Sequence, residues 1–268
     1  MSEAPRAPAA AGRVIGEFLR AHVREADARG VVVGLSGGVD SALVARLARD
    51  ALGPEQVLGV LLPNAAVPAA LVAETEAFGR RLGIELRTVR LEPIESALRT
   101  AVPEIVDRVT LGNSTARLRM LILYAFARER RLLVAGTGNK SELLLGYFTK
   151  YGDGAADLLP IGDLYKSDVY ALGRELGLPS AVLERPPSAG FWEGQTDEGE
   201  LGQTYATVDR VLRRVELLER EEEIVRATGV DAATVRSIVG RVERFRHKRR
   251  LPPVAKLGLR TIGLDWRE

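Results

Sequence analysis

The sequence contains no cysteine, and its two histidines are His22 and His247. The absence of cysteine excludes a disulfide framework, a thiolate nucleophile and metal sites with thiolate ligands. Two histidines argue against a metal site built from several imidazoles. No run of about 18 apolar residues is present, and the N-terminus lacks the basic and apolar segments of a signal peptide. We therefore expect a cytoplasmic protein with no membrane partner.

An excess of charge of one sign is also missing. Lys and Arg total 38 against 36 Asp and Glu, which gives a formal net charge of +2. A nucleic-acid binder usually carries a clear basic excess, so we expect no nucleic-acid partner. Apolar residues, in contrast, are plentiful: they make up 46% of the 268 residues. That amount suffices for one large α/β domain or two small ones.

Strand-like and helical patterns alternate along the first half of the chain. Short β-branched or apolar runs predict strands at 31–35, 56–62, 85–91 and 132–135. Apolar residues at helical spacing predict helices at 13–28, 40–52, 69–82 and 114–130. This alternation predicts an α/β fold with a doubly wound parallel sheet flanked by helices.

The rest of the chain follows other patterns. Turn-forming residues crowd 146–168 and 186–202, which is typical of substrate loops. We expect residues 146–158 and 186–202 to be mobile without ligand. Helical patterning returns at 204–226 and 231–246 and predicts a helical C-terminal part. Residues 1–12 are rich in Ala and Pro and indicate a disordered tail. No repeat or linker divides residues 13–268, so we expect one domain there.

A glycine turn follows the first predicted strand. It reads Gly34, Leu35, Ser36, Gly37, Gly38, Val39, Asp40 and Ser41. Paired glycines let backbone N–H groups converge, and a helix start adds its positive dipole end, so the turn suits a phosphate. Asp40 fits such a site if a cation such as Mg²⁺ neutralises it. The alternative is a plain glycine-rich turn with Asp40 as the N-cap of the helix.

The turn is neither a Walker A loop nor a dinucleotide fingerprint, because Gly-Lys-Ser/Thr and G-x-G-x-x-G are both absent. Its SGGVDS segment resembles the pyrophosphate loop of the ATP pyrophosphatase superfamily. That resemblance implies an enzyme that splits ATP into AMP and pyrophosphate, usually by adenylating an acceptor. It does not fix the acceptor.

A second motif covers residues 136–166 and reads GTGNKSELLLGYFTKYGDGAADLLPIGDLYK. It closely resembles the signature of NAD synthetases. With SGGVDS, the likeness extends over roughly residues 13–255. It implies a Rossmann-like NAD synthetase domain of the ATP pyrophosphatase type over residues 13–268, and ATP-dependent amidation of deamido-NAD⁺ to NAD⁺.

The resemblance also implies roles toward ATP. Asp40 and Glu142 would hold Mg²⁺ against the phosphates, and the 34–41 loop would contact ATP together with Thr137, Lys166 and Ser188. Simpler interpretations exist for each: Glu142 as a helix-surface carboxylate, Thr137 as a turn residue and Lys166 as a surface lysine. Gly190 stands where the family more often has Asp, which leaves no contact to assign there.

Five residues match the family's deamido-NAD⁺ contacts: Arg117, Lys150, Asp157, His247 and Lys248. The resemblance further implies a homodimer with this substrate across the interface. The alternative for Arg117 is an arginine on an ordinary helix face. For residues 244–250, the alternatives are a solvated basic helix end and a nucleic-acid patch.

The implied reaction is that of a ligase that forms a C–N bond in two steps. The nicotinate carboxylate attacks the α-phosphorus of ATP and releases pyrophosphate, and ammonia then displaces AMP. Charge neutralisation and positioning suffice, so we expect no covalent nucleophile. Glutamine-dependent relatives carry an amidase domain with a catalytic Cys. This sequence has no Cys, so we expect free ammonia as the donor, unless a separate glutaminase subunit delivers it. Asp157 is one conceivable base for ammonium, without a firm assignment.

Two rival functions stay open at this point. One is another adenylating enzyme of the superfamily, such as a tRNA-modifying or sulfur-inserting one. The absence of Cys and of a basic excess argues against it. The other is a non-catalytic nucleotide-binding regulator, which predicts a decayed set of phosphate and metal residues. Asp40, Glu142 and Lys166 are all present, which favours the enzyme.

Overall fold

A computed structural model describes residues 8–188, 190–192 and 194–262. Four parallel strands form one sheet in the order β3-β2-β1-β4. The strands are β1 (Val31–Gly34), β2 (Val57–Leu61), β3 (Glu85–Thr88) and β4 (Leu133–Val134). The chain runs from β1 outward to β3 and then returns to the other side of β1 with β4. The sheet is therefore doubly wound, as predicted, and its switch point lies between β1 and β4.

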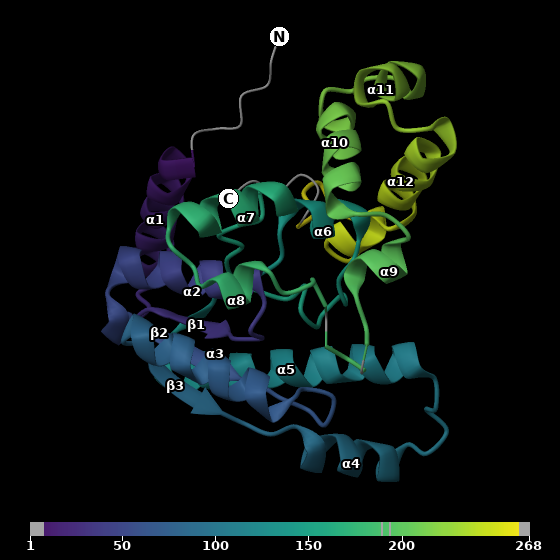
Figure 1. Ribbon diagram of the computed structural model, residues 1–268. Helices are drawn as coiled ribbons and strands as arrows, with labels where there is room; N and C mark the ends of the chain where they lie inside the picture. The colour runs from purple at the N-terminus through teal and green to yellow at the C-terminus, as the bar shows by residue number, and fades with distance from the viewer. Residues whose placement is uncertain (1–7, 189, 193, 263–268) are drawn as a thin grey trace.

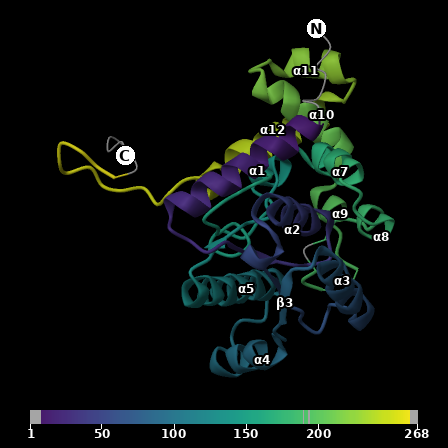
Figure 2. The ribbon, with the colours of Figure 1, turned by 90° about the vertical axis from the view of Figure 1, so that its left-hand side faces the viewer.

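Helices cover both faces of this sheet (Figures 1 and 2). The β1 side chains alternate: Val31 and Val33 enter one buried cluster and Val32 enters another. The first cluster joins the sheet to α1 (Pro8–Glu25), α2 (Val39–Leu52), α3 (Ala69–Leu82), α7 (Lys166–Glu175) and α8 (Ser180–Leu183). The second joins it to α5 (Arg108–Arg130), which follows α4 (Glu92–Ala101).

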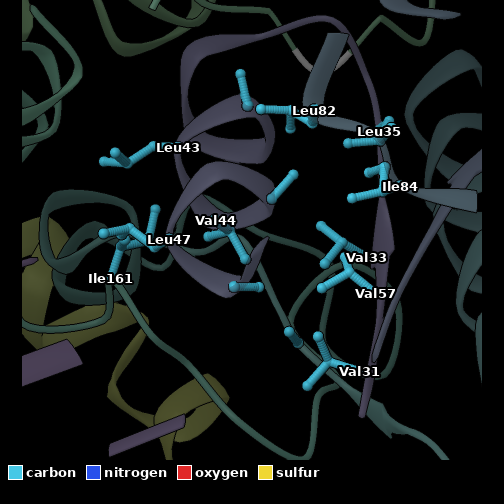
Figure 3. Close-up of a cluster of buried hydrophobic side chains, with 14 of the residues drawn as sticks. Val31, Val33, Leu35, Leu43, Val44, Leu47, Val57, Leu82, Ile84 and Ile161 are labelled. Atoms are coloured by element: carbon cyan, nitrogen blue, oxygen red, sulfur yellow. The ribbon is translucent and has the colours of Figure 1, made fainter. Parts of the chain in front are cut away.

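Figure 3 shows the first cluster, in which α2 packs on the sheet. Val44 of α2 points toward Val31 and Val33 of β1, whereas Leu43 and Leu47 point to the other side of the helix, where Leu47 lies beside Ile161. All six side chains are almost fully buried. Burial of one such side chain stabilises the fold by about 1.5–3 kcal/mol. This packing fixes the start of α2, and with it the glycine turn, against the end of β1.

Three C-terminal helices form a third hydrophobic cluster, smaller than the first, with α6 from the middle of the chain. The four helices are α6 (Lys140–Leu145), α10 (Tyr205–Glu216), α11 (Glu221–Thr228) and α12 (Ala232–Arg244). Short elements complete the fold: η1 (Pro54–Gln56), α9 (Asp197–Leu201) and η2 (Arg246–Arg249). Among the described helices, none is long and apolar enough to cross a bilayer.

Several predicted boundaries are wrong. Residues 8–12 of the predicted tail are the first turns of α1, which ends at Glu25; residues 1–7 lie outside the described residues. The helix predicted over 204–226 is two helices, because Leu218 adopts a φ of +59° between α10 and α11. The turn-rich region 146–168 ends earlier than expected, because α7 begins at Lys166. Helices α4, α6, α7, α8 and α9 were not predicted.

Candidate active site

The glycine turn connects β1 to α2 at the carboxyl end of the sheet, beside the switch point. Gly37 has a φ of +82°, and a Cβ there would lie 2.6 Å from Leu71 Cδ1. The positive φ favours glycine, and any larger residue would also have to displace the Leu71 side chain. Ser41 Oγ donates to Gly38 O at 3.0 Å and accepts from Ser36 N at 3.2 Å. These bonds hold the turn in a closed shape.

The N-terminus of α2 is available to an anion. Its N-cap is Gly38, and no side chain caps it. The interpretation of Asp40 as N-cap is therefore wrong: Asp40 lies in the first turn, and its carboxylate contacts other elements. The first N–H groups of a helix have no partner within the helix and attract negative charge.

Lys166 lies between two carboxylates that come from the two strands flanking the switch point. Its Nζ contacts Asp40 Oδ2 at 2.5 Å and Glu142 Oε1 at 3.2 Å. Lys166 is 1% exposed, so it is not a surface lysine. Asp40 follows β1 and Glu142 follows β4, so the doubly wound topology brings the two together as predicted.

Asn139 completes this arrangement. Its Nδ2 donates to Asp40 Oδ1 at 2.9 Å, and its Oδ1 accepts from Glu142 N at 3.0 Å. Glu142 Oε2 in return accepts from Asn139 N at 3.2 Å, which forms a capping box at the start of α6. We call Asp40, Asn139, Glu142 and Lys166 the strand-end cluster. Each of its carboxylate oxygens has a donor.

The electrostatics of the strand-end cluster favour a buried cation. Burial disfavours the charged form of Lys166, yet Asp40 and Glu142 hold the pKa of its ammonium above the ordinary value. Burial raises the pKa of Glu142 above its ordinary value, against the opposing effect of Lys166 and with a further rise from Asp40. The site therefore favours positive charge at the point where the two strands end.

A cavity of about 320 Å³ opens beside the glycine turn. Leu35, Phe78 and Val182 form part of its apolar wall, and Arg81 and Arg185 lie at its border. Arg185 donates to Gly37 O at 2.5 Å and to Glu74 Oε2 at 2.6 Å. Apolar walls with a few polar groups are typical of ligand pockets.

Four of the predicted substrate residues gather at the other end of α6. Arg117 donates to Lys150 O at 3.4 Å, and Lys150 Nζ donates to His247 O at 3.1 Å. Lys248 Nζ donates to Gly146 O at 2.8 Å and to Phe148 O at 2.6 Å. We call Arg117, Lys150, His247 and Lys248 the basic cluster. Within the part of the chain that the structure describes, the hydrogen bonds of Arg117, Lys150 and Lys248 go to main-chain carbonyls.

Cationic side chains also cover the carbonyl end of α6. Arg249 donates to Leu143 O and Leu144 O at 3.3 and 2.6 Å. Arg241 donates to Leu145 O at 3.2 Å. Together with the Lys248 bond to Gly146, they satisfy four successive carbonyls, which a helix end leaves without partners. The C-terminal segment is thereby fastened to the helix that carries Glu142.

The comparisons with known proteins agree with this geometry. Residues 12–252 match the family described as NAD synthase. The chain belongs to this family.

Its relatives share most of their length with it. The NH(3)-dependent NAD(+) synthetase of Methanosarcina mazei is 48% identical over 92% of this chain and 98% of its own. A solved NMN synthetase from Francisella tularensis superposes with a TM-score of 0.85 at 35% identity, covering 94% of this chain and all of that one. An NH3-dependent NAD synthetase from Campylobacter jejuni gives a TM-score of 0.80 at 31% identity, with the same coverage.

The remaining predicted residues of this family member have no hydrogen bond to either cluster among the bonds of the described residues. Thr137 is half-buried just beyond β4. Ser188 is exposed, and its Oγ accepts from Gly190 N at 3.1 Å. Asp157 accepts from Val134 N at 2.8 Å and from Tyr124 at 3.2 Å. Because these bonds fix its carboxylate to the edge strand β4, Asp157 is a poor candidate for a mobile base.

Three residues of the site were not assigned a role from the sequence. Asn139 could have been found, because an N-cap residue three positions before Glu is the capping-box pattern. Asp197 lies in the 186–202 segment, for which only loop behaviour was expected. Arg185 had no signal at all, since its contact with Gly37 joins residues 148 positions apart.

Proposed function

We propose that this chain catalyses the reaction of its family, the ATP-dependent amidation of deamido-NAD⁺ to NAD⁺ with ammonia. This ligase reaction is the last step of NAD⁺ biosynthesis. The observation that carries the proposal is the strand-end cluster, in which Lys166, Asp40 and Glu142 meet beside a helix N-terminus without a side-chain cap. A non-catalytic regulator would have no need of this buried charge arrangement, which is costly to assemble.

ATP would lie along the carboxyl ends of β1 and β4. We place its nucleoside end in the cavity beside the glycine turn and its phosphates at the N-terminus of α2. Lys166 would then donate to the phosphates and stabilise the charge that develops as pyrophosphate leaves. Thr137 and Ser188 are assigned to ATP as well, on the resemblance alone.

Mg²⁺ would be held by Asp40 and Glu142. Within the described ranges no group of three or more acidic or histidine side chains forms a metal site. The two carboxylates nevertheless fit, because hard oxygen ligands from both strands already converge on one cation, the Lys166 ammonium. When bound, Mg²⁺ would neutralise phosphate charge. The same two carboxylates orient Lys166.

Deamido-NAD⁺ would bind across the basic cluster. Arg117, Lys150 and Lys248 present positive charge to a pyrophosphate, and His247 and Asp157 are assigned with them on the resemblance.

We also propose a homodimer. Val109 and Leu121, on the same helix as Arg117, are 56% and 60% exposed, which suits burial against a second copy.

A product assay tests the function. Purified protein is incubated with Mg-ATP, deamido-NAD⁺ and either ammonium or glutamine, and NAD⁺, AMP and pyrophosphate are quantified. We expect NAD⁺ and AMP in equal amounts with ammonium and almost none with glutamine. AMP without NAD⁺ would point to another acceptor, and no AMP would favour a regulator.

The same assay is repeated with the mononucleotide that corresponds to deamido-NAD⁺, because one solved relative is an NMN synthetase. We expect the dinucleotide to be preferred.

A cytoplasmic location stays a prediction, which cell fractionation would check.

A further inference from the structure

Asp209, on α10, is a buried carboxylate that neither cluster contains. It is 2% exposed, compared with 5% for Asp197 at the start of α9. Its Oδ1 accepts from Ser141 Oγ at 2.5 Å, and its Oδ2 accepts from Ser167 N at 2.8 Å. Because both oxygens already have donors within the protein, Asp209 is not a candidate for direct contact with a substrate.

The two serines that bind Asp209 are chain neighbours of charged residues in the strand-end cluster. Ser141 precedes Glu142 in the first turn of α6, and Ser167 follows Lys166 at the start of α7. Ser141 is 0% exposed, and its Oγ also accepts from Lys166 N at 2.9 Å. A chain of hydrogen bonds thus runs from Asp209 through Ser141 to the main chain of Lys166.

These bonds give the start of α7 the acceptors that the helix itself lacks. The first N–H groups of a helix have no acceptor within it, and the helix dipole favours a carboxylate at this end. In α7, Lys166 N donates to Ser141 Oγ and Ser167 N donates to Asp209 Oδ2. The acceptors come from α6 and α10, so Asp209 couples the position of α7 to that of α6.

The burial of Asp209 has a cost that its hydrogen bonds offset only in part. Burial raises the pKa of Asp209 above its ordinary value, against the opposing effect of the bonds from Ser141 and Ser167 and of the Arg213 charge. An apolar side chain would avoid this cost. The gain from a carboxylate here therefore lies in the geometry that directed hydrogen bonds impose on three helices.

We propose that Asp209 is a positioning residue of the amidation, which holds α6 and α7 so that Lys166 Nζ lies between Asp40 and Glu142. This role rests on the proposed function, because it acts through the ammonium group that is proposed to stabilise the leaving pyrophosphate. The lysine side chain is long and flexible, so its charge is placed accurately only if its main chain is fixed. A displacement of about 1 Å at a reacting centre can lower a rate about 100-fold.

The split between kcat and KM tests this role. Asp209→Asn keeps the shape of the side chain but presents an N–H group to one of its two donors. We expect kcat to fall about tenfold, with the KM values for ATP and deamido-NAD⁺ within about twofold of those of the wild type. Glu216→Gln is the matched control. Glu216 also lies on α10 and accepts from Lys140 Nζ and the Tyr165 hydroxyl at 2.7 and 2.6 Å, and neither bond involves Lys166.

The control should keep kcat within about twofold of the wild-type value. Equal kcat values for folded Asp209→Asn and for Glu216→Gln would overturn the positioning role while the proposed function stands. A wild type that forms no NAD⁺ would overturn the proposed function and this role with it.

A double-mutant cycle separates positioning from a general loss of stability, which would leave kcat per folded molecule unchanged. Ser141→Ala removes the hydroxyl that links Asp209 to Lys166 N, and it carries the same kinetic expectation if Asp209→Asn does not fold. If Asp209 acts through Ser141, the two single variants lose similar amounts of kcat, and the double variant loses no more than either. Losses that multiply in the double variant would show independent effects and would overturn the proposal.

Discussion

The strand-end cluster and the basic cluster lie at opposite ends of α6, and they handle charge in different ways. In the strand-end cluster, Lys166 is paired with Asp40 and Glu142, and each carboxylate oxygen has a donor. In the basic cluster, Lys150 and Lys248 contact carbonyl oxygens. The first arrangement is complete before any ligand arrives, whereas the second still attracts an anion. Preorganised charge suits the transition state of adenylation, and unpaired positive charge suits substrate capture.

Replacement of Lys166 by Met should have the largest effect. It removes the charge proposed to stabilise the leaving pyrophosphate, and we expect kcat to fall about 10³-fold in the product assay. Lys140→Met is the control, since Lys140 contacts Asp163 and Glu216 at 3.0 and 2.7 Å outside the cluster. Thermal unfolding must show that Lys166→Met is folded. If the kcat of Lys166→Met were close to that of Lys140→Met, the buried charge of the strand-end cluster would have no special role in catalysis.

Asp197→Asn should alter stability in a pH-dependent way. Burial raises the pKa of Asp197 to about 6 from an ordinary value of 3.8, so the folded state binds more protons than the unfolded chain between these values. The unfolding free energy of the wild type should therefore fall, relative to that of the variant, as pH rises from about 4 to about 6. The difference should reach at most about 3 kcal/mol. Urea titrations at several pH values measure it, and parallel curves would contradict the assignment.

Gly146→Ala tests how firmly the C-terminal segment is attached to α6. Gly146 has a φ of +62°, and a Cβ there would lie 2.2 Å from Phe245 Cβ. We expect a loss of about 2–4 kcal/mol in unfolding free energy from strain and overpacking. Gly229→Ala is the matched control, because its φ is +68° but its added Cβ meets nothing within 4 Å. It should lose only about 1 kcal/mol. If the two variants lost the same unfolding free energy, the Phe245 side chain would be able to move away from the added Cβ at little energetic cost.

The smallest predicted effect concerns Lys248. Lys248→Met should raise the KM for deamido-NAD⁺ about tenfold through loss of one charge-assisted contact. The KM for ATP should stay unchanged. Arg246→Met, at an exposed neighbouring position, serves as the control. A rise in the KM for ATP alone would instead assign Lys248 to the strand-end cluster.

The sheet could largely be predicted from local sequence patterns. Asp40, Glu142 and Lys166 of the strand-end cluster were named through the family resemblance, and Asn139 was not predicted. Val31–Gly34 is a short β-branched run, and Asp40 and Glu142 follow the two strands that topology brings together. The prediction of α3 at 69–82 was confirmed in full. Parallel pairing then determines which strand ends meet.

The parts that were missed depend on contacts between distant residues. The bonds of Arg249 to the carbonyls of Leu143 and Leu144 span more than a hundred positions, and no periodicity encodes them. Helix α6 has six residues, too few to show an apolar period. The surroundings of Asp197 include Tyr205 and Tyr147, which belong to separate segments.

The shortness of α6 has a consequence for how the two substrates affect each other. Its six residues span about 9 Å. An anion that draws Lys248 away from Gly146 and Phe148 leaves the negative end of the helix dipole with less counter-charge. That change acts on the helix whose first turn contains Glu142. Binding at one end then alters affinity at the other, and by thermodynamic reciprocity each ligand alters the affinity of the other by the same factor.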